Sequence, residues 1–169
     1  MQNTVLRYGL YGAIAICALF LLSWSLLKDL DYSAQEIFGY ASIIISLSFV
    51  FFGIKHFRDK VNNGAIGLGK GILIGVLISF ITALTFGILN VVYVKYINPD
   101  FMSEYYSHYA AELEASLPAE EFKQQLAKLE EEKELFSNPF MSFFIMSMTV
   151  FMIGFIISLI SSLLLQQKK

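Results

Sequence analysis

The sequence predicts an all-α integral membrane protein, a four-helix bundle with an extracytoplasmic helical hairpin between its third and fourth spans. Three observations lead to this fold class. Hydrophobic residues make up 56% of the 169 residues and charged residues 15%, whereas an average soluble domain is about 45–50% apolar and about 25% charged. Four long stretches contain no charged residue and no histidine. A polar, acidic segment separates the last two of these stretches.

The four apolar stretches cover residues 8–27, 37–54, 71–94 and 140–165. A helix needs about 20 mainly apolar residues to cross the roughly 30 Å hydrocarbon layer, because lipid cannot solvate unpaired backbone groups. The alternative, four buried helices in one soluble domain, leaves too few residues to cover them with polar surface. We therefore predict a single membrane domain over residues 1–169, with residues 95–139 as an acidic helical insertion outside the membrane.

The first stretch follows Arg7 and could be mistaken for a secretory signal. Its apolar run is longer than the roughly 7–15 residues of a signal core, and the segment 24–28 has no pair of small residues for cleavage. We expect it to stay attached as a membrane anchor.

The orientation follows from the basic residues that flank the spans, because Lys and Arg resist translocation. The N-terminus, residues 55–70 and the C-terminus together hold seven of the 12 basic residues and one acid, Asp59, whereas the other side holds 13 of the 14 acids. This polarity predicts that both termini lie in the cytoplasm. The basic residues between the second and third spans, Lys55, Arg58 and Lys60, also fit the recognition of anionic headgroups. We favour topology determination alone, since such clusters usually hold more basic residues.

The third span carries the most specific pattern in the chain. Small residues recur every four positions at Gly67, Gly71, Gly75, Ser79, Ala83 and Gly87. Such repeats let two helix backbones approach closely, which replaces the hydrophobic drive that lipid cannot supply. We favour packing inside one subunit over a dimer interface.

Each of the other spans also has a face of small residues. These faces are Gly9, Ala13 and Cys17 in the first span, Gly39, Ser46 and Gly53 in the second, and Gly154, Ser158 and Ser162 in the fourth. A compact bundle in which every helix presents one small face to its neighbours is the expected result.

The segment between the third and fourth spans reads as two helices. In the first, Asn98-Pro99 is expected to act as N-cap and first helical residue, and apolar positions then recur at Phe101, Tyr105, Tyr109 and Leu113. Leu117-Pro118 ends this helix and starts the second, whose apolar stripe is Phe122, Leu126, Leu129 and Phe136. Asn138-Pro139 is expected to cap the fourth span.

One set of residues in this segment has spacing that could suit a metal ion. Glu104, His108 and Glu112 follow Asp100 at intervals of four, which stacks them along one helix face. Carboxylates and an imidazole can bind a divalent cation. An acidic helix produces this spacing by chance, so a solvated face is the favoured interpretation and no cofactor is predicted.

Several other functions are excluded by residue inventory. One cysteine, Cys17, allows no disulfide within the chain, and no zinc-type Cys/His cluster exists. The segment 64–71 resembles a phosphate-binding loop with Lys70 as its lysine, but it lacks the following Ser/Thr and a preceding strand. No nucleophile, base and orienting acid occur together, and nothing indicates nucleic-acid binding.

The pattern as a whole resembles the bacterial membrane family known as domain of unknown function 4199. The resemblance rests on the order of four spans, on the segments 51–59, 67–71 and 98–101, on Pro139 and on residues 154–160. It covers nearly the whole chain and implies a bacterial inner-membrane protein without an established activity or site residues.

The sequence therefore favours a non-enzymatic accessory or scaffold subunit that acts through helix packing and the outer hairpin. Its expected partners are the lipid bilayer and either another membrane or periplasmic protein or a second copy of the chain. The alternative is a small oligomeric transporter or channel with Asn90, Thr82, Thr85 and serines along its path. Coupled transporters usually place ionisable groups at the midplane, which these spans lack. A membrane enzyme using Glu104, His108 and Glu112 is the least favoured class.

Overall fold

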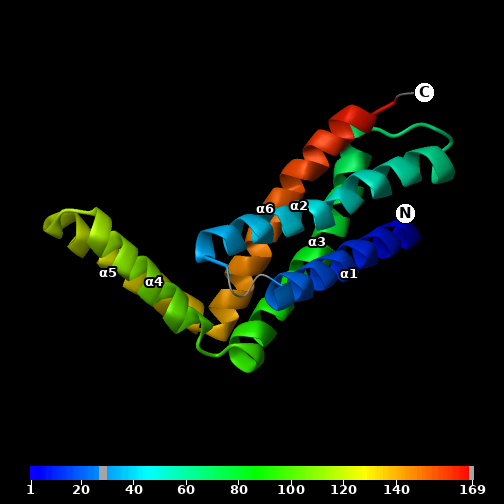
Figure 1. Ribbon diagram of the computed structural model, residues 1–169. Coiled ribbons are helices and arrows are strands. Elements are labelled where there is room, and N and C mark those ends of the chain that lie inside the picture. Colours follow the sequence, from blue (N-terminus) through cyan, green and yellow to red (C-terminus); the bar gives the residue numbers. More distant parts are fainter. Residues whose placement is uncertain (27–29, 168–169) are drawn as a thin grey trace. The chain divides into compact units, whose positions relative to one another are not determined.

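The computed structural model describes residues 1–26 and 30–167, and within them the chain is all-α (Figure 1). Six α-helices follow one another: α1 (Gln2–Leu26), α2 (Tyr32–His56), α3 (Leu68–Val92), α4 (Phe101–Ser116), α5 (Ala119–Ser137) and α6 (Pro139–Leu165). One π-helical turn, η1 (Phe57–Val61), extends α2, and another, η2 (Tyr93–Ile97), extends α3. The predicted fold class is confirmed, including the hairpin between the third and fourth spans.

Four helical segments are long and apolar enough to cross a membrane: Gln2–Leu26, Tyr32–Val61, Leu68–Ile97 and Pro139–Leu165. The four predicted spans are confirmed, but most helices extend beyond the predicted bounds. A span prediction ends where charge begins, whereas a helix continues until its backbone hydrogen bonds stop, so α2 includes Glu36 and α1 includes Arg7. The predicted end of the first span at Leu27, and Lys28, Lys168 and Lys169, lie outside the described residues.

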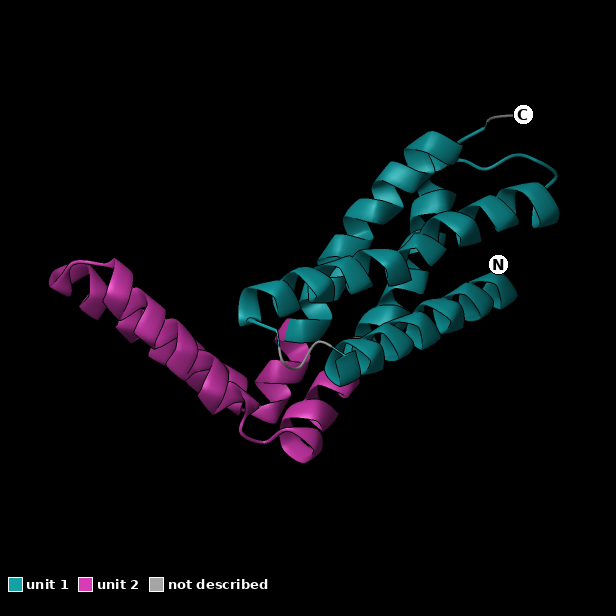
Figure 2. Ribbon diagram, in the orientation of Figure 1, with its two compact units in different colours: residues 1–86, 146–169 teal, residues 87–145 magenta. Residues whose placement is uncertain are grey.

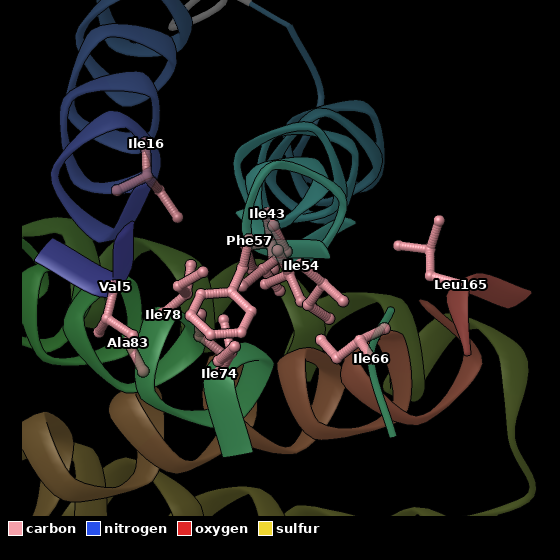
Figure 3. Close-up of a cluster of buried hydrophobic side chains, with 13 residues drawn as sticks. Val5, Ile16, Ile43, Ile54, Phe57, Ile66, Ile74, Ile78, Ala83 and Leu165 are labelled. Atoms are coloured by element: carbon pink, nitrogen blue, oxygen red, sulfur yellow. The ribbon is translucent and has the colours of Figure 1, made fainter. Parts of the chain in front are cut away.

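The chain divides into two compact units, Met1–Phe86 with Met146–Lys169, and Gly87–Ile145 (Figure 2). The first unit contains α1, α2 and most of α3 and α6. Its apolar core is formed by residues from all four helices: Ile16, Leu47, Val50, Ile54, Ile74, Ile78 and Val150 (Figure 3). The same helices expose large apolar side chains on their outer faces, among them Ile14, Ile44, Leu73 and Ile160. Apolar residues on both the inner and outer faces suit a bundle surrounded by lipid.

At one end of the first unit, the connection from α2 to α3 meets the end of α6 (Figure 1). Asn63 and Gly64 turn the chain with φ of 52° and 81°, a region that L side chains other than Asn and Asp rarely adopt. Ile66 and Gln167 then exchange two backbone hydrogen bonds of 3.0 and 2.9 Å as an antiparallel bridge. The bridge joins the connection to the C-terminal side of α6.

The second unit contains the α4–α5 hairpin. α4 ends before Leu117 and α5 begins after Pro118, as predicted. The expected cap at the start of α6 is also confirmed, because Asn138 Oδ1 accepts the backbone N–H groups of Phe140 at 3.0 Å and Met141 at 3.3 Å.

The predicted cap at Asn98-Pro99 is wrong, since α4 begins at Phe101 after Asp100, which makes no side-chain cap hydrogen bond. The chain there still belongs to the end of α3. Asn98 N–H donates to Tyr93 O and closes the π-helical turn, so this residue ends one helix and does not start the next.

Candidate functional site: the α3–α6 seam and the α4–α5 hairpin

The small residues of α3 face those of α6 in antiparallel register. A Cβ added at Gly71 would lie 2.8 Å from Ser162 Oγ, and one at Gly75 would lie 2.6 Å from Ser158 Oγ. A Cβ added at Gly154 would lie 2.5 Å from the Ser79 side chain. Each step of four residues up α3 therefore matches a step of four down α6, and a glycine opposes a serine at every step. We call this contact the α3–α6 seam.

The seam is polar, but most of its hydroxyl groups donate hydrogen bonds within their own helices. Ser158 Oγ donates to Gly154 O at 2.6 Å and Ser79 Oγ donates to Gly75 O at 2.9 Å, while the two hydroxyls lie 3.5 Å apart. Serine hydroxyls bonded to a carbonyl one turn earlier need no partner on another helix. Ser162 Oγ is the exception, since it is buried and has no hydrogen-bond partner within residues 1–26 and 30–167.

The six residues predicted to pack do not all belong to the seam. Gly71, Gly75 and Ser79 do, and Ala83 and Gly87 continue the stripe as buried residues. Gly67 does not, because it is exposed, precedes α3 and has open space where its Cβ would be. The spacing of four holds in the sequence there, but the helix has not yet begun.

The first two helices approach α3 through other glycines. A Cβ at Gly9 would lie 2.5 Å from Ile81, and Cβ atoms at Gly12 and Gly53 would clash with the side chains of Thr82 and Ile78. Gly12 was missed by the sequence analysis, although its spacing of three from Gly9 is a helical signal. Gly39, predicted to share the face of Gly53, has open space instead.

Three of the polar residues considered for a transport path, Thr82, Thr85 and Asn90, form hydrogen bonds within the protein. Thr82 Oγ1 donates to Ile78 O at 3.3 Å and Thr85 Oγ1 to Ile81 O at 2.9 Å. In the second unit, Asn90 Oδ1 accepts a hydrogen bond of 2.8 Å from Ser142 Oγ, and both residues are buried. This bond joins the end of α3 to the start of α6.

A continuous aromatic series runs from η2 at the end of α3 onto α4. Ring centroids are separated by 5.4 Å between Tyr93 and Phe101, 5.8 Å between Phe101 and Tyr105, and 4.7 Å between Tyr105 and Tyr109. These separations are typical of favourable aromatic pairs. The predicted apolar positions on both helices are half-buried, whereas the acids of α5 are exposed.

Tyr106 is the most buried residue of the hairpin, with 6% of its surface exposed. Burial raises the pKa of Tyr106 to about 12, and the negative charge of Glu132 on α5 acts in the same direction. The sequence analysis missed Tyr106 because it lies next to, not on, the stripe of four-residue spacing.

Tyr106 gives a pH-dependent prediction. An unfolded tyrosine ionises near pH 10, whereas the pKa of folded Tyr106 is about 12. The folded state therefore keeps the Tyr106 proton to a higher pH than the unfolded state does. The contribution of this protonated side chain to the free energy of unfolding is complete below about pH 10 and is lost as the pH rises through about 12. Unfolding of wild type and Tyr106→Phe, followed by circular dichroism in detergent between these limits, measures the effect. We expect a smaller alkaline loss in Tyr106→Phe, and an equal loss in both proteins would contradict the prediction.

The candidate metal ligands lie on α4. Glu104, His108 and Glu112 are exposed, and the ring of His108 packs against Tyr109 with centroids 5.6 Å apart. Within residues 1–26 and 30–167, no group of three or more His, Cys, Asp or Glu side chains could hold a metal ion. The structure thus does not bring these three residues together as a ligand set.

Four apolar helices of spanning length around a common core define a multi-pass membrane protein. The chain belongs to the family described as Protein of unknown function (DUF4199), whose model matches residues 7–167. This match confirms the resemblance seen in the sequence. No curated protein and no solved structure matches the chain.

Proposed function

We propose that this protein is a non-enzymatic accessory or scaffold subunit of the bacterial inner membrane, with both termini in the cytoplasm. It acts through helix packing and through the α4–α5 hairpin. The hairpin is the observation that carries the proposal: helices of 16 and 19 residues pack on each other and leave the carboxylates of α5 exposed. The concentration of basic residues at the opposite ends of the spans supports the orientation.

The hairpin suits recognition of a membrane or periplasmic protein with a basic surface. Paired helices hold their charges at fixed positions, and complementary charge gives specificity and a fast encounter. The exposed acids of α5 include Glu120, Glu121, Glu130 and Glu131, and the structure shows an ion pair for one of them, with Lys123 Nζ 3.8 Å from Glu120. Exposed pairs of this kind contribute little, so these carboxylates remain available to a partner.

Purification of the full chain from its native membrane in mild detergent, followed by mass spectrometry, tests the proposal. We expect one companion protein at a fixed ratio. The variant Glu120→Gln/Glu121→Gln/Glu130→Gln/Glu131→Gln should lose this companion, whereas the control Lys123→Gln/Lys128→Gln on the same helix should retain it. A homogeneous preparation without a companion, or a companion retained by the acid variant, would contradict the proposal.

The alternative function is a small oligomeric transporter or channel. It is favoured by the hydroxyls of Ser46 and Ser162, which are 1% exposed and have no hydrogen-bond partner among the described residues. A buried polar group without a partner costs free energy in an apolar environment. Ion flux into liposomes that contain wild-type protein, together with a changed flux in Ser46→Ala/Ser162→Ala, would favour a transporter over a scaffold subunit.

A further inference from the structure

One end of the first unit holds the start of α1, the α2–α3 connection and the end of α6 (Figure 1). Five basic residues belong to the segments at this end. They come from three segments of the chain and comprise Arg7, Lys55, Arg58, Lys60 and Lys70. Asp59 is the one acid in residues 1–11, 55–70 and 165–167. The end of the bundle is therefore strongly positive, because one carboxylate cannot neutralise five cations.

Arg58 forms an ion pair with this carboxylate. Its Nε lies 2.6 Å from Asp59 Oδ1, and its Nη1 donates to Leu165 O on α6 at 3.4 Å. Lys55, Lys60 and Lys70 form no ion pair within the described part of the chain. Lys70 Nζ lies 5.2 Å from the ring centroid of buried Phe57, a contact that orients the ammonium group without neutralising it. Three lysines at this end thus have no anionic partner among the residues that the structure describes.

An open cavity of about 500 Å³ lies at the same end of the unit, between the α2–α3 connection and Gln167. Asn62, Asn63, Gly67 and Gln167 are among its lining residues, and Lys60 directly precedes the lining segment. The cavity is held in shape by the Ile66–Gln167 bridge and by Asn62 Nδ2, which donates to Ala65 O at 2.5 Å. A preformed cavity loses little conformational entropy when a ligand binds. We call the cavity and the three unpaired lysines the basic pocket.

We propose that the basic pocket binds the headgroup phosphate of an anionic phospholipid in the adjoining leaflet. The spanning segments end here, so the pocket lies at the level where lipid phosphates lie. Amide side chains and ammonium groups are donors that match phosphate oxygens. Each basic residue near an anionic surface increases the preference for anionic over neutral lipid about fivefold. Topology determination requires only that the cations exist, and it does not require a preformed cavity at the same end of the bundle.

Lipid selectivity of the full chain tests the pocket. Wild-type protein is reconstituted in phosphatidylcholine vesicles with trace spin-labelled phosphatidylglycerol or spin-labelled phosphatidylcholine, and electron paramagnetic resonance compares the two association constants. We expect a preference of about fivefold or more for phosphatidylglycerol. Lys55→Gln/Lys60→Gln/Lys70→Gln should reduce it close to onefold, whereas Lys55→Arg/Lys60→Arg/Lys70→Arg should retain it.

The matched control is Lys123→Gln/Lys128→Gln/Lys133→Gln, which removes the same charge from the hairpin and should leave the preference unchanged. An equal reduction in this control, or no preference in wild type, would overturn the proposal. Loss of the preference on addition of inorganic phosphate at constant ionic strength would also overturn it, because the ligand would then be free phosphate. If the triple variant does not reconstitute, Lys60→Gln and Lys70→Gln are measured singly, and a preference unchanged in both would overturn the proposal.

Discussion

Replacement of Gly75 by leucine is expected to destabilise the bundle by about 3 kcal/mol or more. The seam leaves no room at this position, since a Cβ alone would lie 2.6 Å from Ser158 Oγ and 3.0 Å from Val50 Cγ1. These neighbours belong to α6 and α2, so the larger side chain pushes α3 away from two helices at once. Overpacking of this kind costs about 1–3 kcal/mol, and more where backbones must separate. Unfolding of the purified protein in detergent, followed by circular dichroism, measures the loss.

Gly69→Leu is the matched control, because it introduces the same side chain into the first turn of α3. Open space surrounds Gly69, and leucine has the higher helix propensity, so stability should be unchanged or slightly increased. The exchange Gly75→Ser/Ser158→Gly tests the register itself, since it moves one hydroxymethyl group across the seam. It should be more stable than Gly75→Ser alone. Equal stability of Gly75→Leu and Gly69→Leu would contradict the packing described for the seam.

Leu47→Ala is expected to destabilise the protein by about 2–3 kcal/mol. Leu47 is fully buried in the core, and its Cδ2 lies 3.2 Å from the place where a Cβ on Gly154 would be. Truncation leaves a cavity whose walls lose dispersion contacts. We expect a loss of stability near the low end of the range for core leucines. In the unfolded state the separated helices are still surrounded by lipid or detergent, so little transfer free energy is lost.

Leu73→Ala is the control for this prediction. Leu73 lies on the third span with 47% of its surface exposed, so its truncation removes contacts with lipid and leaves no internal cavity. We expect a change within about 0.5 kcal/mol. If Leu73→Ala destabilised the protein as much as Leu47→Ala, the outer face of α3 would be a protein contact and not a lipid-facing surface.

Local signals in the sequence were sufficient for the membrane-spanning helices and for the hairpin. Charge-free runs predicted four spans because the cost of burying charge in hydrocarbon acts on each segment separately. Pro118 and Asn138 marked helix boundaries because their effects are confined to one turn. The same reasoning failed at Asn98, where the preceding helix continued through a π-helical turn and used the N–H group of that residue.

The pairing of helix faces depended on the tertiary structure. Spacing of four identified small faces on α3 and α6, but Gly67 and Gly75 look equivalent in the sequence, and only Gly75 meets Ser158. Gly12 has a helical spacing from Gly9, but only the structure shows that it lies against Thr82. Tyr106 lies beside the stripe of four-residue spacing, and only the structure shows that it is buried.

The basic pocket also depends partly on the sequence alone and partly on the tertiary structure. The sequence by itself determined that basic residues concentrate in the segments at one end of the spans, because the distribution of charge is a property of the chain. Only the tertiary structure decided that Gln167 pairs with Ile66, 101 positions earlier in the chain, and that a cavity lies beside this bridge. Contacts between distant segments depend on shape complementarity in three dimensions, which no local pattern of residues encodes.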